Sequence, residues 1–373
     1  MRELVNLAVD LDERFEASHA PPAPSGIAVV PATAAGERTL AWIDDEFGGA
    51  WSSEAHAGSN AIAYRGDAPV AFATYDARGF GYAWLEGLAR EHGVGIFGPF
   101  GVARGERGAG LGRTILWHAL SSMRARGFAR ACIAAVGTPE LIQFYGETVN
   151  ARVAERFDRA ALLTPLKRAV VMASGSGTNF QAVLDRARDG ALPLNVVALV
   201  CNNPGAYAIE RARAAEVAVE VMAWQRKEES RERYDARLLE AVRAHEPDVV
   251  LLLGWMHLLG EPFVAAFPNL LNVHPAFLPL DPARDDVVLP DGSRMPAYRG
   301  PRSAADALAA GASWIGATVH LVTPETDRGP VLTRKPLRVA AGETLDGVMA
   351  RLHPIEHQLV AAAILRRQYE RWR

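Results

Sequence analysis

Cysteine is scarce in this chain, which has only Cys132 and Cys201 among its 373 residues. Each lies in a short apolar run, at residues 131–133 and 199–201. Cysteines that are far apart in apolar runs are typical of reduced core residues, and not of a disulfide framework or a cysteine metal site. We therefore expect a fold held together by packing, with chemistry that needs no metal.

Long apolar segments and an excess of one charge are also missing. The longest apolar run, residues 249–256, has the length of a strand and is too short to cross a bilayer. The N-terminus is acidic and amphipathic, unlike a secretory signal. The 40 basic and 43 acidic residues leave a net charge of -3, which gives no reason to expect nucleic acid or an anionic membrane as a partner. These features predict a soluble cytoplasmic protein.

The length exceeds that of one ordinary hydrophobic core, so two domains are expected. The strand and helix pattern changes near residue 165. We expect a helical extension at residues 1–26, a mixed α/β domain at 27–163 and a second α/β domain at 164–373. In the second domain, continuous Val and Leu runs alternate with helices, which predicts a parallel-rich sheet covered on both faces.

The first domain contains a glycine-rich turn between a strand and a helix. The strand is expected at residues 95–102, the turn contains Gly108 and Gly110, and the helix is expected at 113–126. Such a turn leaves backbone N–H groups pointing outward at the positive end of the helix dipole, which favours an anion. A tight structural turn is the alternative.

This region resembles the GNAT-type N-acetyltransferases, because the turn has their R-x-x-G-x-G form and Tyr145 follows on a later helix. The resemblance covers residues 27–160 and implies a loop that grips the pyrophosphate of acetyl-CoA. It also implies that Tyr145 protonates the departing thiolate. The implied acyl-CoA-binding residues are Val102, Arg107, Gly108, Ala109, Gly110, Leu111 and Gly112.

The role of the first domain stays open at this stage. Tyr145 is equally well explained as a half-buried aromatic residue of a helix, and no residue identifies itself as the general base, with Glu86 only a guess. The domain can act as an acetyltransferase, bind acetyl-CoA without turnover, or merely support the second domain.

The second domain has its own glycine-rich turn, at residues 174–179, directly after its opening strand. In a parallel sheet, ligands bind at the carboxyl ends of the strands, so a phosphate is expected at this turn. The expected phosphate-binding residues are Ser176, Gly177, Thr178 and Asn179. A capped turn that binds nothing is the alternative.

Asn272, His274 and Asp327 form the most informative set of polar residues. Asn272 and His274 end another strand of the same sheet, and Asp327 lies in a turn after a later strand. An amide donor, a protonated imidazole and a carboxylate can stabilise an oxyanion and take the proton of an attacking amine. Taken singly, each residue has a structural explanation, as a strand-end amide, a buried neutral histidine or a turn cap.

These motifs, in this order, resemble the phosphoribosylglycinamide formyltransferases over about residues 168–365. The resemblance implies a Rossmann-like domain, 10-formyltetrahydrofolate as donor and Asn272, His274 and Asp327 as the catalytic set. It also implies that Glu356 contacts the acceptor amine, although a surface charge is the alternative for this residue. The implied folate-binding residues are Met256, His257, Leu258, Leu259 and Thr326. His257 departs from the family pattern, which has a longer basic side chain.

Residues 280–297 form an insertion directly after the catalytic His-Pro, where the purine enzyme has almost nothing. Asp291-Gly292 within it predicts a small hairpin over the pocket. After it, residues 299–302 look more like methionyl-tRNA formyltransferases. The acceptor therefore stays open between glycinamide ribonucleotide, the first candidate, and another small amine such as a nucleotide-sugar amine or a hydroxamate precursor. The number of chains that assemble is also left open, with a homodimer one form.

Overall fold

The computed structural model describes residues 3–32 and 34–372, so Met1, Arg2, Thr33 and Arg373 lie outside the described residues. The chain divides into two compact units. The first unit contains the residues up to 47, residues 51–164 and those from 367 onward, and the second contains residues 48–50 and 165–366. The change of unit after residue 164 lies next to the predicted boundary, but the last residues of the chain belong to the first unit.

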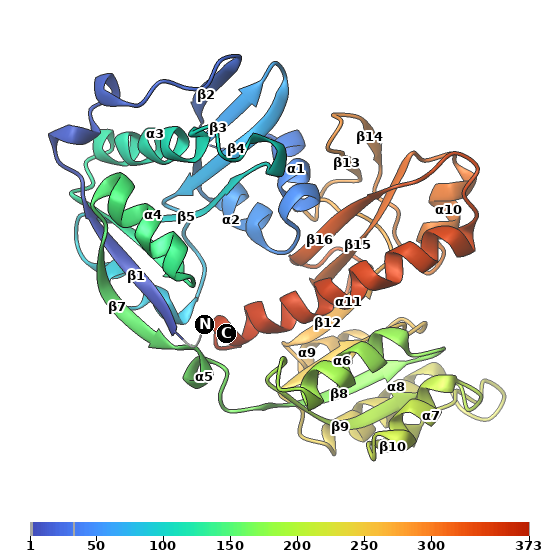
Figure 1. The fold of residues 1–373 in the computed structure, drawn as a ribbon. Coiled ribbons are helices and arrows are strands. Elements are labelled where there is room, and N and C mark those ends of the chain that lie inside the picture. The colour runs from blue at the N-terminus through green and yellow to red at the C-terminus, as the bar shows by residue number, and fades with distance from the viewer. Residues whose placement is uncertain (1–2, 33, 373) are drawn as a thin grey trace. The chain divides into compact units, whose positions relative to one another are not determined.

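The first unit contains a seven-stranded sheet of order β2-β3-β4-β5-β6-β1-β7 (Figure 1). Its strands are β1 (Glu3–Asp10), β2 (Ile27–Ala32), β3 (Ser59–Arg65), β4 (Ala68–Tyr75), β5 (Val94–Val102), β6 (Arg130–Val136) and β7 (Arg152–Asp158). Its helices are α1 (Glu37–Phe47), α2 (Trp51–Ala57), α3 (Leu111–Ala125), α4 (Pro139–Val149) and α5 (Arg159–Leu162). Short 3-10 turns lie at η1 (Glu13–Phe15), η2 (Ala17–His19), η3 (Ala83–Leu85), η4 (Leu88–Arg90) and η5 (Arg104–Glu106).

The N-terminal segment corrects one prediction. Residues 1–26 were expected to be a helical extension, but Glu3–Asp10 is an inner strand that pairs with both β6 and β7. Val5, Leu7 and Val9 are buried on one face of this strand. The segment is therefore part of the first core, and its buried apolar residues follow the period of two of a strand.

Helices α3 and α4 cover one face of the first sheet. Leu116 and Leu120 of α3 and Val149 of α4 pack with Ala73 and Ile133 of the sheet in one buried cluster. On a different set of strand positions, Val94 and Cys132 pack with Leu88 of η4. Both faces are therefore covered, and the turn before α3 is fixed at the end of β5.

The second unit contains a seven-stranded sheet of order β10-β9-β8-β11-β12-β15-β16, and a separate two-stranded sheet (Figure 1). The strands of the large sheet are β8 (Lys167–Ala173), β9 (Leu194–Cys201), β10 (Ala218–Val221), β11 (Val249–Leu252), β12 (Leu270–His274), β15 (Trp314–Leu321) and β16 (Val331–Arg338). The small sheet pairs β13 (Asp286–Val288) with β14 (Arg294–Pro296). The helices are α6 (Thr178–Arg188), α7 (Tyr207–Ala214), α8 (Arg231–Arg243), α9 (Glu261–Ala266), α10 (Ser303–Ala309) and α11 (Leu345–Tyr369), of which α11 extends into residues of the first unit.

The second sheet is parallel from β10 to β12 and antiparallel from β12 to β16. Val170 and Met172 of β8 pack with Tyr234 of α8 and Phe263 of α9. Val171, which points to the opposite face, is also fully buried. The sheet is thus covered on both faces, as the continuous apolar runs predicted. Both units have mixed α/β architecture, with a parallel-rich sheet in the second.

No helix within residues 3–32 and 34–372 combines the length and the apolarity that a membrane crossing needs. The cytoplasmic location and the homodimer stay predictions of the sequence.

Candidate active site

The second unit contains a cavity of about 440 Å³ at the carboxyl ends of its parallel strands. The turn after β8, the loop after β11, the end of β12 and the Asp327 turn all contribute to its wall. Every residue expected to act in the second domain lines it: Ser176, Gly177, Thr178, Asn179, Met256, His257, Leu258, Leu259, Asn272, His274, Thr326, Asp327 and Glu356. Residues from segments far apart in the sequence thus share one cavity.

Asp327 is the centre of the polar cluster. Its Oδ2 atom lies 3.5 Å from Nδ1 of His274, and its Oδ1 atom lies 3.4 Å from Nδ2 of Asn272. The backbone N–H of Gly300 donates to Oδ2 at 2.7 Å. Asp327 itself has a left-handed backbone with φ of 52°, a conformation that is strained for a residue other than glycine. A strained backbone at this carboxylate indicates that its position is fixed by its surroundings.

The Asp327 carboxylate is ionised at neutral pH. Burial opposes its ionisation, but His320, His274 and the Gly300 N–H together outweigh burial and lower the pKa to about 2. Its charge is therefore available to stabilise a positive charge that develops beside it.

His274 lies between two hydrogen-bond acceptors, the Asp327 carboxylate and the carbonyl of Tyr298. Burial lowers the pKa of its imidazole, and Asp327 offsets this only in part. The carbonyl of Tyr298 lies 2.9 Å from Nε2, and because a carbonyl only accepts, Nε2 carries a proton. Both ring nitrogens thus face protein groups, and the ring orientation is fixed.

His320 belongs to the cluster but was not among the expected site residues. It lies opposite Asn272 in the register of β12 and β15, with its Nε2 atom 3.2 Å from Nδ2 of Asn272 and 3.5 Å from Oδ1 of Asp327. Nδ1 of His320 donates to the carbonyl of Leu321 at 2.8 Å, so Nε2 can accept from Asn272. A single histidine within an otherwise apolar strand was the sequence signal for it.

The expected phosphate loop opens helix α6. Gly177 caps the helix with φ of 72°, and a Cβ atom there would lie 2.9 Å from the side chain of Ala208. Only glycine fits this position without strain. Ser174 Oγ accepts from the backbone N–H of Met256 at 3.0 Å, which ties this loop to the loop after β11. The N–H groups at the start of α6 therefore line the cavity on a rigid turn.

Asn179 connects the expected phosphate loop to Glu356, the residue expected to contact the acceptor amine. Its Nδ2 atom donates to Oε2 of Glu356 at 2.8 Å, while its Oδ1 atom is buried without a hydrogen-bond partner. Burial raises the pKa of Glu356 to about 7, although the Asn179 hydrogen bond lowers it. Glu356 can thus exchange a proton near neutral pH, whereas Asp327 cannot.

The loop after β11 presents apolar side chains at the cavity. Met256 is 56% exposed and Leu258 is 66% exposed. His257 lies between them and packs edge-on against Trp224, Tyr234 and Trp255. Burial, followed by Arg231, lowers the pKa of His257. This residue therefore does not supply the basic charge expected at its position in the family.

The inserted segment forms the predicted hairpin but does not cover the cavity. Strands β13 and β14 pair around Asp291-Gly292, as expected. No residue from 280 to 297 lines the cavity, so the expected position over the pocket is wrong. The reason is that the hairpin turn is tied elsewhere: Nε1 of Trp314, at the far end of β15 from His320, donates to Asp291 at 2.8 Å. Trp314 and His320 are roughly 20 Å apart along β15.

In the first unit, the expected acyl-CoA residues lie together at the end of β5 and the start of α3. Gly108 and Gly110 have φ of 86° and 84°, and Gly110 caps α3. A Cβ atom at Gly112 would contact Val102 and Phe144. Strand β5 pairs with β6 only as far as Phe97 and then continues to Val102 beside β4 alone. The glycine-rich turn thus follows directly after residues 98–102, the part of β5 that does not pair with β6.

Tyr145 is buried on α4, near the rings of Phe97, Phe100 and Phe144. Burial raises the pKa of its hydroxyl well above the ordinary value. The hydroxyl therefore stays protonated at neutral pH, the state that a proton donor requires. Glu86, which was guessed to be the general base of the first domain, forms an ion pair with Arg90 at 3.3 Å. Among the described residues, no group of three or more His, Cys, Asp or Glu side chains is arranged to hold a metal ion.

The fold and the site together define a two-unit transferase, with an acyl-CoA type of loop in one unit and a formyl-transfer type of cluster in the other. Residues 167–280 and 290–364 match the family described as formyl transferase. The chain belongs to the formyl transferase family. The unmatched residues 281–289 lie inside the expected insertion. Residues 30–148 match the acetyltransferase (GNAT) family, which confirms the resemblance described for the first domain.

Related proteins match the second unit. The phosphoribosylglycinamide formyltransferase of Bacillus subtilis (strain 168) is 30% identical over 203 residues, which are 53% of this chain and 93% of the relative. That of Escherichia coli (strain K12) is 34% identical over 196 residues, 52% of this chain and 84% of the relative. The crystal structure of glycinamide ribonucleotide transformylase 1 from Symbiobacterium toebii has 35% identity and a TM-score of 0.47, covering 53% of this chain and 86% of that one.

Proposed function

We propose that the second unit transfers a formyl group from 10-formyltetrahydrofolate to the primary amine of a phosphorylated small molecule, with glycinamide ribonucleotide the first candidate. The observation that carries this proposal is the convergence of Asn272, His274 and Asp327 with the α6 phosphate loop in one cavity. The two curated relatives support the acceptor, because each is a phosphoribosylglycinamide formyltransferase.

The residues of the loop after β11 fit a folate donor. Met256 and Leu258 leave apolar surface exposed beside the cavity, which suits a flat aromatic ring system with backbone groups at its edge. When bound, this donor supplies a formyl group that is already an activated amide. Thr326 lines the same cavity and precedes Asp327 in the chain. The donor would therefore be held close to the polar cluster.

Each residue of the polar cluster has a separate role in the proposed reaction. The 3.4 Å contact between Asn272 Nδ2 and Asp327 is long, so this N–H can turn to donate to the formyl oxygen. His274 orients Asp327, because its Nδ1 atom faces the carboxylate while its Nε2 atom is held by the carbonyl of Tyr298. Asp327, ionised at neutral pH, stabilises the positive charge that develops on the attacking nitrogen. The proton of this nitrogen passes through water to the folate nitrogen, which is released when its bond to the formyl carbon breaks.

Glu356 is assigned to the acceptor amine. A carboxyl group with a pKa of about 7 can take a proton from an incoming ammonium group near neutral pH, which leaves the amine nucleophilic. Asn179 places Glu356 next to the phosphate loop, so one acceptor molecule can present its phosphate and its amine to neighbouring groups.

A second candidate is N-formylation of a different small amine, such as a nucleotide-sugar amine or a hydroxamate precursor. This is favoured by residues 281–289 of the insertion, which the family match leaves out, and by the fused acetyltransferase-like unit. Steady-state formyl transfer from 10-formyltetrahydrofolate to a panel of amines separates the two candidates. Turnover of glycinamide ribonucleotide supports the first. Turnover of another amine without it supports the second.

We propose acetyl-CoA as the ligand of the first unit, held by the backbone of residues 107–112. The support is the pair of left-handed glycines at the start of α3 and the protonated Tyr145 hydroxyl nearby. Calorimetric titration with acetyl-CoA tests this proposal. Heat of binding and a raised melting temperature support a ligand site, whereas neither signal would leave a supporting role for this unit.

A further inference from the structure

Two arginines connect the inserted segment to the catalytic carboxylate. Arg299 lies just after the insertion, and its Nε atom donates to the backbone carbonyl of Asp327 at 3.2 Å. Arg328 is the next residue after Asp327 in the chain. Both side chains are largely shielded from solvent, with 14% and 28% exposure. Movement of either arginine would therefore pull on the turn that holds Asp327.

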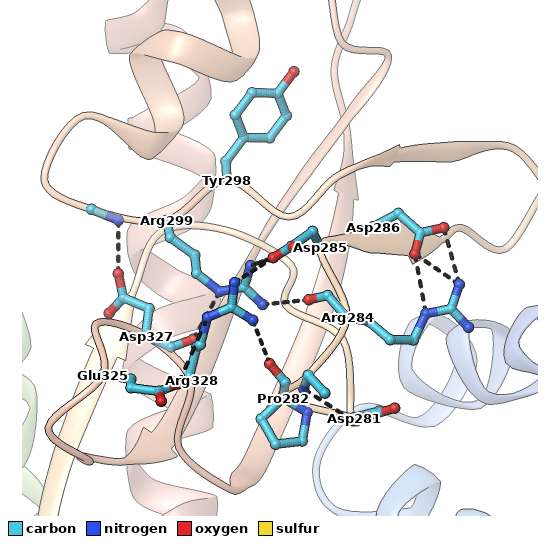
Figure 2. A network of polar contacts seen from close by, with 12 residues as sticks. Asp281, Pro282, Arg284, Asp285, Asp286, Tyr298, Arg299, Glu325, Asp327 and Arg328 are labelled. Carbon is cyan, nitrogen blue, oxygen red and sulfur yellow. Dashed lines mark hydrogen bonds and ion pairs between the residues drawn. The ribbon is translucent and has the colours of Figure 1, made fainter.

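Asp285 of the insertion binds both arginines through the same oxygen. Nη1 of Arg299 donates to Oδ1 of Asp285 at 3.0 Å, and Nη2 of Arg328 donates to the same atom. Figure 2 shows the two guanidinium groups beside one another, turned toward Asp285. Without a negative group between them the two cations repel, and Arg328 indeed contributes, after burial, to lowering the pKa of Arg299. Asp285 thus holds two like charges together.

The backbone of the insertion completes the attachment. Nη2 of Arg299 donates to the carbonyl of Arg284 at 2.7 Å, and Nη1 of Arg328 donates to that of Pro282 at 2.8 Å (Figure 2). Gly300, which follows Arg299, supplies the N–H that donates to Asp327 Oδ2. The contacts run continuously from the insertion to the carboxylate oxygen.

We infer that Asp285 is a positioning residue for formyl transfer, which acts through Arg299 and Arg328 to hold the strained Asp327 turn against Gly300. The insertion therefore supports the catalytic carboxylate from outside the cavity. This inference rests on the proposed formyl transfer for its kinetic consequence, but its structural consequence can be observed without turnover. It gives the inserted segment a function that its absence from the cavity wall otherwise leaves unexplained.

The structural test compares Asp285→Ala with Asp286→Ala in the full chain. Asp286 is the matched control, because it lies in the same hairpin and pairs with Arg284 and Arg294, with no contact to Arg299 or Arg328. We expect crystals of the Asp285→Ala variant to show Asp327 Oδ2 beyond hydrogen-bonding reach of Gly300 N, with the control unchanged. An unchanged Asp327 turn in Asp285→Ala overturns the inference, whether or not the chain transfers formyl groups.

The kinetic test uses Asp285→Asn, Asp285→Glu and Asp286→Asn. A displacement of Asp327 is expected to lower kcat about tenfold in Asp285→Asn, with KM for both substrates unchanged. A loss of folding stability alone does not lower kcat per folded molecule at unchanged KM. Asp285→Glu should restore part of kcat. Equal kcat values in Asp285→Asn and Asp286→Asn contradict the inference.

The two tests separate this inference from the proposed function. If the unaltered chain formylates no amine, the proposed function fails, and the crystal comparison alone decides the role of Asp285. If the unaltered chain is active and Asp285→Asn has full activity, the proposed function holds and the positioning role fails.

Discussion

The two units contain the same backbone device in different surroundings. In each, a strand leads into a glycine-rich turn, and a left-handed glycine caps the next helix: Gly110 before α3 and Gly177 before α6. Around Gly177, the turn after β15 brings Asp327 and helix α11 brings Glu356, and the pKa values of these two residues are shifted in opposite directions. Two residues after Gly110, Gly112 faces the aromatic rings of Phe100 and Phe144, with Tyr145 the buried titratable group near them. A left-handed glycine turn at the start of a helix is therefore common to both units, whereas carboxylates with shifted pKa values distinguish the second.

Of the changes considered, replacement of Asp327 should have the largest effect, because it removes a shifted carboxylate that distinguishes the second unit. Asp327→Asn keeps the size of the side chain but removes the charge that the cavity stabilises, so formyl transfer should fall by about a thousandfold or more. The measurement is kcat for the unaltered chain, for Asp327→Asn and for Asp306→Asn, a surface aspartate of the same unit. Loss of activity in both variants, or in neither, would remove Asp327 from the mechanism.

Glu356 should make the stability of the chain depend on pH. Its folded pKa of about 7 lies above the ordinary value of 4.5, so the folded state binds a proton that the unfolded state has released. The resulting stability is complete below pH 4.5 and is lost as the pH rises through 7, by about 3 kcal/mol. Urea unfolding at several pH values measures it. Glu356→Gln should lose this dependence, and an equal pH slope in both proteins would show that Glu356 titrates normally.

The phosphate loop offers a matched pair of glycines. Gly177 and Gly190 both have φ of 72°, but a Cβ atom at Gly177 would meet Ala208, whereas Gly190 has open space around it. Gly177→Ala should raise KM for the phosphorylated amine about tenfold, while Gly190→Ala should cost only the backbone strain of about 1 kcal/mol. Steady-state kinetics with chemical denaturation separates the two effects. A normal KM in Gly177→Ala would argue that the turn does not hold the phosphate.

The corresponding test in the first unit should give the smallest effect. Gly110 and Gly127 have similar left-handed φ values and open space, but only Gly110 caps the start of α3. Gly110→Ala should weaken acetyl-CoA binding by about threefold to tenfold through strain at the turn, with Gly127→Ala unaffected. Calorimetry provides the dissociation constants. Equal affinities in both variants would place the ligand away from this turn.

The sequence predicted the elements that local patterns specify. The turn at residues 174–179 and the strand-end residues Asn272 and His274 follow continuous apolar runs, which are strong signals of buried parallel strands. Asp327 was found because its place in the order of motifs matched the family. The N-terminal strand was missed because its apolar residues fit a helix as well as a strand, and only its pairing with β6 and β7 decides.

The contacts between distant segments could not be predicted in the same way. His320 joins the site through its register opposite Asn272, which no local pattern reveals. The hairpin itself was predicted from Asp291-Gly292, but its position depends on the hydrogen bond with Trp314 and on the ion pairs of Asp285. The bond between Asn179 and Glu356 likewise joins residues 177 positions apart. Long-range pairing therefore decides which polar residues become a site.

The most direct measurement is mass spectrometry of glycinamide ribonucleotide and the other candidate amines after incubation with 10-formyltetrahydrofolate and the full chain. The account predicts one amine that gains a single formyl group, with no such product when Asp327→Asn replaces the unaltered chain. Unmodified amines throughout, from a folded protein with an intact cavity, would contradict the assignment of formyl transfer to the Asn272, His274 and Asp327 cluster.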